Sequence, residues 1–394
     1  MIAQDLTPEE GPSRPADSVP ADVLLLCWRD TGHPQGGGSE RYLERVGAEL
    51  ARRGSRVTLV TARYRGAPHR QMRDGLRIVR TGGRLSVYPR TLLMLAAARL
   101  GRGRLAGYRP DVVVDTQNGV PFFAALVASA PTVVLVHHCH REQWPVAGPV
   151  LSRLGWWIES WLSPRVHRDH RYVTVSEPSA AELVGLGVDR NRIAVVRNGV
   201  DPVPEGLAER AVAEDLRLIV VSRLVPHKQV EDALTVAGRL RDSGVRLRLD
   251  VVGGGWWNDE LRASATELGI DDRVTFHGHV DDVRKHELLA NADLHLMPSR
   301  KEGWGLAVIE AAQHSVPTIG YRSSAGLTDS IVDGETGVLV DDVDELTAAT
   351  GSLAADRARL TELGDAARVR SRRYSWSTTA DGFEAVFREV LGEN

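Results

Sequence analysis

The stretch that says most about the fold is Arg300-Lys301-Glu302-Gly303-Trp304-Gly305-Leu306-Ala307-Val308-Ile309-Glu310-Ala311-Ala312. It follows an apolar run, Ala292 to Met297, that is typical of a buried strand, and its glycines predict a tight turn into a helix. A helix start offers free N–H groups and a positive dipole end to a phosphate. Glu302 would lie in the loop and Glu310 about one turn into the helix. Carboxylates there can bind vicinal hydroxyls of a sugar and a ribose; the alternative is a loop acid and a solvated helix acid.

Short apolar runs alternate with helical stretches along the rest of the chain, which is typical of parallel α/β sheets. We expect strands in two series, at 22–28, 56–61, 76–80, 111–115, 132–137, 172–175 and 193–196, and at 216–222, 247–252, 274–276, 293–297, 317–320 and 337–340. The turn-rich segment 198–206 separates the series. With 394 residues, the sequence predicts two doubly wound Rossmann-like domains that face each other across a cleft, at 21–200 and 207–375.

Composition places the chain among ordinary globular proteins, with 42% apolar and 26% charged residues. The net charge of −3 gives no reason to expect a nucleic-acid partner. Cys27 and Cys139 lie in or just after apolar runs, so we expect buried free thiols in a reducing, cytoplasmic compartment. Residues 1–20 form an expected loose tail and not a signal peptide. No apolar run reaches the roughly 20 residues of a membrane span.

A basic pair, Arg223 and Lys228, follows the first strand of the second series. Ligands of open α/β sheets bind at the carboxyl ends of strands. Two cations at this spacing can clamp a diphosphate and offset the charge that develops as it leaves. Only three of the 49 basic residues are lysines, which makes Lys228 stand out. The alternative is a pair of solvated surface cations.

The glycine run at 36–38 lies between the first strand and an amphipathic helix, where glycine lets backbone approach a ligand. It is not the dinucleotide fingerprint, because Arg41 stands where the third glycine is expected. The second expected strand also ends in Thr61-Ala62-Arg63, without the ribose-binding acid of that fingerprint. These two departures disfavour a nicotinamide-dependent oxidoreductase.

Histidines cluster after the fifth expected strand, at His137, His138 and His140. A metal site is the alternative that we disfavour, because these residues alternate in an extended stretch with no acidic ligand near them in sequence. Gln117 and Asn118 end the fourth strand, where they could meet a polar acceptor from inside the cleft.

The carboxylate spacing and the glycines of residues 300–312 resemble the E-x7-E motif of retaining GT-B glycosyltransferases of family four, and Arg223 and Lys228 resemble their Arg-x4-Lys element. The resemblance implies that Glu302 holds the transferred sugar, that Glu310 holds the nucleotide ribose and that Arg223 and Lys228 stabilise the leaving diphosphate. It places His137 beside the sugar, with His138 as the fallback. It also implies a helix, 376–391, that packs back on the first domain.

The resemblance assigns further residues by position. Catalytic roles fall on Arg223, Lys228, Glu302 and His137; donor binding falls on Gly37, Gly38, Gly254, Val280, Gly303, Gly305, Leu306 and Glu310; and acceptor binding falls on Gln117, Asn118 and His138. No cofactor and no metal is implied. The donor would be a UDP- or GDP-sugar, and the hydroxyl acceptor a glycolipid, a polysaccharide or a natural product.

The implied activity is transfer of a hexose from a nucleotide diphosphate with retained anomeric configuration. A nucleotide-sugar epimerase of the GT-B fold and a non-catalytic binder of sugars or nucleotides remain as alternatives. An epimerase needs an acid and a base around the bound nucleotide, and a binder does not need Arg223, Lys228 and Glu302 to cluster.

Four tryptophans, Trp144, Trp156, Trp157 and Trp161, lie among arginines in the first domain. Their helical spacing favours a helix that is buried in the core. The alternative is a surface in peripheral contact with the inner face of a membrane, or with a lipid acceptor.

Overall fold

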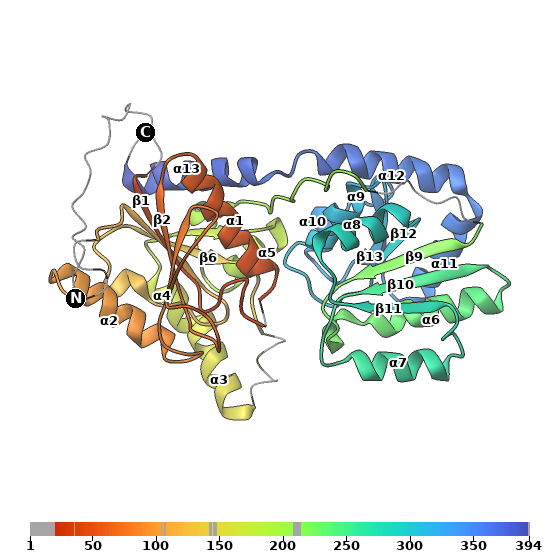
Figure 1. Cartoon of the computed structure of the whole chain (residues 1–394), viewed down its shortest axis with the longest axis horizontal. Coiled ribbons are helices and arrows are strands. Elements are labelled where there is room, and N and C mark those ends of the chain that lie inside the picture. Colours follow the sequence, from red (N-terminus) through yellow and green to blue (C-terminus); the bar gives the residue numbers. More distant parts are fainter. Residues whose placement is uncertain are drawn as a thin grey trace.

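The computed structural model describes residues 20–34, 36–103, 105, 108–141, 144, 148–207 and 214–392. Within these residues the chain forms two parallel α/β units, each built on its own sheet (Figure 1). Apart from Pro20, the tail expected at residues 1–20 lies outside the described residues. Both units have the doubly wound, Rossmann-like architecture that the sequence predicts.

Within the described residues the first sheet has eight strands in the order β3-β4-β2-β1-β5-β6-β7-β8, and β3 alone among them runs antiparallel to its neighbour. Its strands are β1 Asp22–Leu26, β2 Arg56–Thr61, β3 Arg70–Arg73, β4 Leu76–Arg80, β5 Val112–Thr116, β6 Thr132–Val136, β7 Arg171–Thr174 and β8 Ile193–Val195. Its helices are α1 Gly38–Arg52, α2 Val87–Arg99, α3 Pro149–Trp157, α4 Ser163–Val166 and α5 Glu177–Gly185, with short turns η1 Ala124–Leu126 and η4 Arg190–Arg192 and a π-helical turn, η3 Ile158–Leu162.

The second sheet has six parallel strands in the order β11-β10-β9-β12-β13-β14. Its strands are β9 Leu216–Val221, β10 Leu247–Val252, β11 Val274–Gly278, β12 Leu294–Met297, β13 Thr318–Tyr321 and β14 Gly337–Val340. Its helices are α6 Val230–Asp242, α7 Asn258–Glu267, α8 Asp282–Asn291, α9 Leu306–Ala312, α10 Leu327–Ser330, α11 Val343–Ala355 and α12 Arg357–Ser371, with η5 Pro226–Lys228 before α6 and α13 Trp376–Leu391 at the end of the chain.

Each sheet reverses its strand order at one place, between β1 and β5 in the first sheet and between β9 and β12 in the second. At such a switch point the loops that leave the carboxyl ends of the two central strands diverge to opposite faces, which opens a crevice for a ligand. The topology therefore places a candidate binding position at the end of β1 and β5 and another at the end of β9 and β12.

Every strand expected from the sequence is present, and β3 is the strand that the sequence analysis missed. It pairs with β4 through a tight turn at Asp74 and Gly75, whose φ angles are 48° and 81°. An Asp-Gly pair is favoured in such turns, because both residues tolerate left-handed backbone. The local hairpin signal was in the sequence, but the polar residues of β3 carry no apolar alternation.

The chain crosses between the two units twice, and the crossings lie against each other. Val200 N donates to Tyr374 O at 3.3 Å, and Val200 forms a parallel bridge with Ser375. After the second crossing, α13 runs along α1 of the first unit (Figure 1). Phe383 and Phe387 of α13 are fully buried, and Arg53, directly after α1, bonds to acidic residues of α13.

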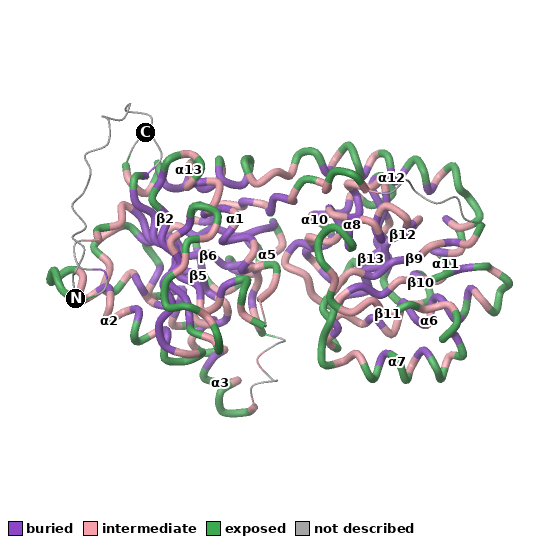
Figure 2. Tube along the Cα trace, viewed as in Figure 1, coloured by how far each residue is buried: buried purple, intermediate pink, exposed green. Residues whose placement is uncertain are grey.

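Burial follows the sheets: Figure 2 shows buried residues along the strands and exposed residues on the outer helices and loops. Cys27 and Cys139 are buried free thiols, as predicted. The prediction that the aromatic helix lies in the core is wrong for Trp157 and Trp161, which keep 45% and 44% of their surface exposed. Among the described residues, none of the helices combines the length and apolar character needed to cross a membrane.

Replacement of Gly199 by alanine tests the packing of the two crossings. A Cβ at this position would lie 2.4 Å from Trp376 N, where only backbone could move aside. We expect Gly199→Ala to lower the free energy of unfolding by about 1 to 3 kcal/mol in urea titration. Gly185→Ala is the control, since that Cβ meets nothing within 4 Å. Equal stability of both variants would contradict close packing at the crossing.

Candidate active site

The carboxyl ends of the two sheets meet at the loop that follows β12. The hydroxyl of Ser176, which follows β7, donates to Gly303 O at 2.6 Å. A Cβ at Gly303 would lie 2.9 Å from the carbonyl oxygen of His137, which follows β6. Backbone of the second unit therefore lies directly against the strand ends of the first, and glycine is the residue that permits this approach.

The loop from Arg300 to Gly305 is held from both units. Arg300 N donates to His227 O at 2.9 Å, and Lys301 forms an ion pair with Glu182 of α5. At its end, Gly305 takes a φ of 87° as the residue before α9. Gly305 is needed because its backbone is left-handed, and Gly303 is needed because it lies directly against the backbone of the first unit. The tight turn into a helix that the sequence predicts is present.

Glu302 lies opposite Lys228, so these two predicted catalytic residues are close together. The Lys228 ammonium donates to Glu302 Oε1, and the two side chains retain only 12% and 11% of their exposure. Arg223 has no ion-pair partner in the described part of the chain. Loss of hydration around its guanidinium lowers the pKa of Arg223, and the nearby charge of Arg29 lowers that pKa further. The charges of Glu40 and Glu302 act in the opposite direction, but neither acid forms an ion pair with Arg223 among the described residues, so its guanidinium remains available to an anion.

Glu310 lies at the end of a chain of ion pairs that reaches the first unit. Lys285 of α8 donates to Glu310 Oε1 at 2.7 Å and to Asp282 Oδ1 at 3.0 Å. Asp282 in turn pairs with Arg41 of α1 at 2.8 Å, and Arg41 pairs with Asp201 of the crossing. Burial raises the pKa of Asp282, but the hydrogen bonds from Arg41 and Lys285 outweigh it and bring the pKa below its ordinary value.

Sequence reasoning missed Lys285, Asp282 and Arg41 as parts of this arrangement. The scarcity of lysine was a usable signal for Lys285, because each of the three lysines pairs with a glutamate: Lys228 with Glu302, Lys285 with Glu310 and Lys301 with Glu182. No sequence spacing connects Arg41 to Asp282, which are 241 residues apart.

His137 is buried, and its ring lies edge-on to Tyr42 with centroids 5.0 Å apart. Burial lowers the pKa of His137 to about 4, so the imidazole is neutral near pH 7. Within the described residues its Nε2 has no hydrogen-bond partner. A neutral imidazole whose Nε2 makes no bond to these residues is able to form a hydrogen bond to a ligand.

His138 is partly buried and stacks on His140, with ring centroids 4.5 Å apart. Burial lowers its pKa well below the ordinary value, and the neighbouring imidazoles and lysines lower it further. Its Nδ1 would lie 3.5 Å from a Cβ built on Gly303. His138 therefore faces the Glu302–Gly303 loop, while His137 borders the core.

The glycine loop after β1 is organised by a buried acid that sequence reasoning also missed. Glu40 accepts from Arg29 Nε at 2.7 Å and from Gly37 N at 2.8 Å, and Asn118 Nδ2 lies 3.4 Å away. The Gly37 amide is thus already occupied, whereas a Cβ at Gly38 would meet none of the described residues within 4 Å. Of the two glycines, Gly38 is the one with open space beside it.

The expectation that Gln117 meets an acceptor needs correction. Its side chain is 1% exposed, and its Oε1 accepts from Ser163 Oγ at 2.6 Å. Gln117 therefore faces α4 inside the first unit, because the strand alternation sends successive side chains to opposite sides. Asn118, the next residue, points toward Glu40.

In the glycine run after β10, the first and third positions have no space for a side chain. A Cβ at Gly253 would lie 1.8 Å from Ser222 O, and one at Gly255 would lie 1.9 Å from Leu224 O. Gly254 has more room, with its nearest neighbour at 3.9 Å. Val280, after β11, is half-buried against the apolar cluster beneath β10. These backbone segments surround the carboxyl end of β9, where Arg223 lies.

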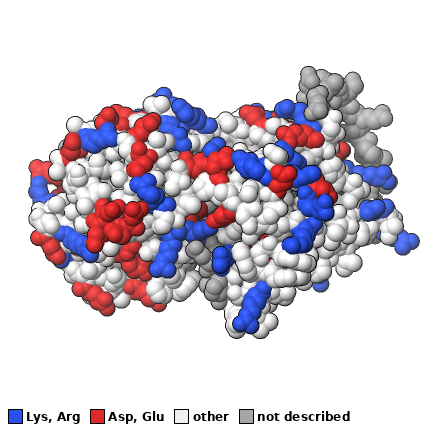
Figure 3. All heavy atoms as spheres, turned by 180° about the vertical axis from the view of Figure 1, so that it is seen from behind, with Lys and Arg blue, Asp and Glu red and all other residues white. Residues whose placement is uncertain are grey.

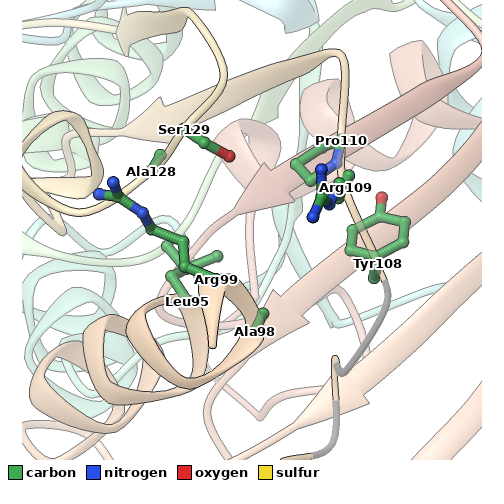
Figure 4. A pocket seen from close by; sticks show the side chains of 8 residues that line it. All are labelled: Leu95, Ala98, Arg99, Tyr108, Arg109, Pro110, Ala128 and Ser129. Atoms are coloured by element: carbon green, nitrogen blue, oxygen red, sulfur yellow. The ribbon is translucent and has the colours of Figure 1, made fainter. Parts of the chain in front are cut away.

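Two cavities lie away from these residues. One of about 200 Å³ is bordered by α2 and by Pro110 and Ser129 (Figure 4). These residues precede β5 and β6, so the cavity is at the amino ends of the strands, opposite the candidate site. Another of about 430 Å³ lies at the crossing, beside Pro202, Gln313 and Arg372.

Metal ligation is not supported by the histidine cluster. Within the described residues, no group of three or more His, Cys, Asp and Glu side chains is arranged to hold a metal ion.

Two facing switch points with paired carboxylates and cations between them define a GT-B glycosyltransferase. Residues 36–203 match the family model described as Glycosyltransferase Family 4, and residues 208–370 match that of Glycosyl transferases group 1. The chain belongs to the family-four glycosyltransferases.

Individual relatives agree with this assignment. The chain is 31% identical to the GDP-mannose-dependent alpha-(1-6)-phosphatidylinositol monomannoside mannosyltransferase of Mycolicibacterium smegmatis, over 88% of this chain and 92% of the relative. It is 32% identical to the D-inositol 3-phosphate glycosyltransferase of Nocardia farcinica, over 68% and 62% of the two chains. Sucrose-phosphate synthase from Thermosynechococcus elongatus has the same fold, with a TM-score of 0.75 and 18% identity over 95% of this chain and all of that one.

The low pKa of His137 predicts a pH-dependent contribution to stability. Burial lowers its pKa from 6.5 to about 4, so the contribution is complete above pH 6.5 and is lost as the pH falls toward 4. Between about pH 7.5 and about pH 4.5 this loss amounts to about 2.5 kcal/mol. Urea titration should show that His137→Asn loses less stability over this range than wild type does. The control is His69→Asn, at an exposed position, which should behave as wild type. An unchanged pH dependence in His137→Asn would contradict a neutral, buried imidazole.

Proposed function

We propose that this glycosyltransferase moves a hexose from a nucleotide diphosphate sugar to a hydroxyl acceptor and retains the anomeric configuration. The observation that carries the proposal is the convergence of three residues where β9 and β12 end: Lys228 pairs with Glu302, and Arg223 lies close enough to Glu302 for its charge to act on the guanidinium. A diphosphate between Arg223 and Lys228 would gain two charge-assisted contacts, and Glu302 would be freed to accept hydrogen bonds from the sugar. Glu310 would hold the ribose.

Retention follows from a reaction in which the acceptor attacks the face that the diphosphate leaves. The departing phosphate oxygen takes the acceptor proton, the new glycosidic bond forms and the bond from the sugar to the phosphate breaks. Arg223 and Lys228 stabilise the charge that grows on the diphosphate. Since His137 is neutral and its Nε2 makes no bond to the residues that the structure describes, its proposed role is to hydrogen-bond the sugar and not to remove a proton.

Each unit takes one substrate in this proposal. Residues 207–375 bind the donor through the backbone around Gly254, Val280, Gly303, Gly305 and Leu306. Residues 21–200, completed by α13, bind the acceptor near Asn118 and His138, and Gly38 leaves room for the donor phosphate. The Lys301–Glu182 and Arg41–Asp282 ion pairs hold the units together while water is excluded.

GDP-mannose is the first donor to test, because the mannosyltransferase of Mycolicibacterium smegmatis carries that donor in its name. UDP-glucose is the second, because HepE of Anabaena, which shares the fold, binds UDP and glucose. The acceptor proposed is a hydroxyl of a polyol or sugar attached to a lipid. The phosphatidylinositol monomannoside in the relative's name supports this class.

The proposal is tested with a thermal-shift panel of nucleotide sugars, followed by transfer assays with the donor that raises the melting temperature most. NMR of the product should show the donor's anomeric configuration. Lys228→Met should lower kcat by about 10²- to 10³-fold, since it removes a charge that stabilises the transition state. Exposed Arg246→Met is the matched control. An inverted product, or full turnover in Lys228→Met, would reject the mechanism.

Lys285 is predicted to position Glu310 for the ribose. Lys285→Met leaves Glu310 and Asp282 without their shared cation, and we expect nucleotide affinity to fall about tenfold, equivalent to about 1.4 kcal/mol. Arg284→Met is the control, because Arg284 pairs with Glu287 on the same helix. Calorimetry with the free nucleoside diphosphate measures both. Wild-type affinity in Lys285→Met would remove Lys285 from the donor site.

A further inference from the structure

One helical segment of the first unit exposes apolar side chains and buries small and polar ones. Residues 149–166 run through α3, η3 and α4 without interruption. Large apolar side chains point to solvent along one stripe: Val150, Leu151, Leu154, Trp157 and Trp161 are 76%, 55%, 50%, 45% and 44% exposed. A helix that faces water on its outer side normally shows the reverse pattern. Contiguous exposed apolar surface of this kind marks an interaction site.

The inner side of the same segment carries small and polar residues spaced four apart. Gly155, Glu159 and Ser163 are buried, and a Cβ at Gly155 would lie 2.2 Å from the ring of Trp144. Glu159 accepts from Trp144 Nε1 at 2.6 Å and from His140 N at 2.9 Å. These polar contacts fix which side faces out, so exposure of the apolar stripe is specified by the fold.

The exposed charges of this segment are all positive. Arg153 and Arg165 are exposed, and Glu159, its one acid, is completely buried. The Arg165 guanidinium lies 4.2 Å from the ring centroid of Trp161, which stacks on Trp157. Tryptophan and arginine side by side are typical of helices that lie in the interface of a membrane, with rings among the acyl chains and cations at the headgroups.

The segment is also placed to reach a flat surface. In Figure 1, α3 projects beyond the rest of the first unit, and Figure 2 shows its outer turns exposed. Seen from behind, this projection has basic side chains among uncharged atoms and no acidic ones (Figure 3). On its inner side, Glu159 bonds to His140, whose neighbours His137 and His138 border Gly303. The segment therefore adjoins the acceptor side of the candidate active site.

We propose that residues 149–166 form a docking helix for anionic lipid bilayers, which brings the first unit to an acceptor held at the membrane surface. The lipid surface is the occupant that the charge pattern selects, because exposed arginines complement acidic headgroups and the stripe between them suits acyl chains. A second copy of the chain would bring like charges together at the same stripe, which is unfavourable. The proposal deepens the proposed function, because it supplies the surface on which a lipid acceptor would be met.

The test is sedimentation of the full chain with vesicles of phosphatidylcholine alone or mixed with phosphatidylglycerol. We expect binding to the mixed vesicles, weakened by salt. Leu154→Ser/Trp157→Ser/Trp161→Ser should reduce the bound fraction at least tenfold, and Arg153→Gln/Arg165→Gln should remove the preference for anionic lipid. Trp256→Ser is the matched control, since Trp256 is 66% exposed on the second unit.

The outcomes separate docking from catalysis. Binding needs no donor, and the thermal shift with nucleotide sugars needs no lipid, so each can fail alone. Circular dichroism and the donor-induced shift should be unchanged in the triple variant. The proposal is overturned if wild type stays in the supernatant, if Trp256→Ser loses as much binding, or if light scattering shows a dimer that the triple variant abolishes.

Discussion

The backbone contact between Gly303 and the strand ends of the first sheet is the constraint on which the rest of the site depends. Gly303 lies at the carbonyl of His137 and accepts from Ser176, so the loop after β12 belongs to both units at once. Glu302 precedes this contact and α9 follows it. The position of each carboxylate of the motif is therefore fixed by how the two sheets meet, and a shift between the units would move both.

Charge pairing within the site follows from this contact. Glu302 and Lys228 are nearly buried, and a buried ion left without its partner is strongly destabilising. In the absence of a substrate each acid of the motif is balanced by a lysine, Glu302 by Lys228 and Glu310 by Lys285. A diphosphate that binds Lys228 would replace the carboxylate, and a sugar hydroxyl would replace the ammonium at Glu302. Substrate binding would then exchange one set of partners of Lys228 and Glu302 for another, so neither buried charge would be left unpaired.

The sequence predicts the fold and the residues on short loops better than it predicts which way their side chains point. Every expected strand is present because parallel strands are fully buried and read as continuous apolar runs. Arg223, Lys228 and Glu302 could be proposed together because the ends of central strands lie at one edge. Gln117 was misjudged because a one-residue difference in a strand reverses the direction of the side chain. Arg41, Asp282 and Glu40 gave no signal, since their partners are set by how distant segments meet.

The helical segment 149–166 shows why the spacing of its apolar residues could not predict whether they lie in the core or at the surface. A stripe of apolar residues has the same spacing whether it faces a core or a membrane. What separates the two is the opposite side of the helix, where Gly155, Glu159 and Ser163 lie. A buried carboxylate needs partners, and Trp144 and His140 supply them from the loop that follows β6. Those polar contacts hold Glu159 inside, so the tryptophans are held outside, beside the histidines that border Gly303.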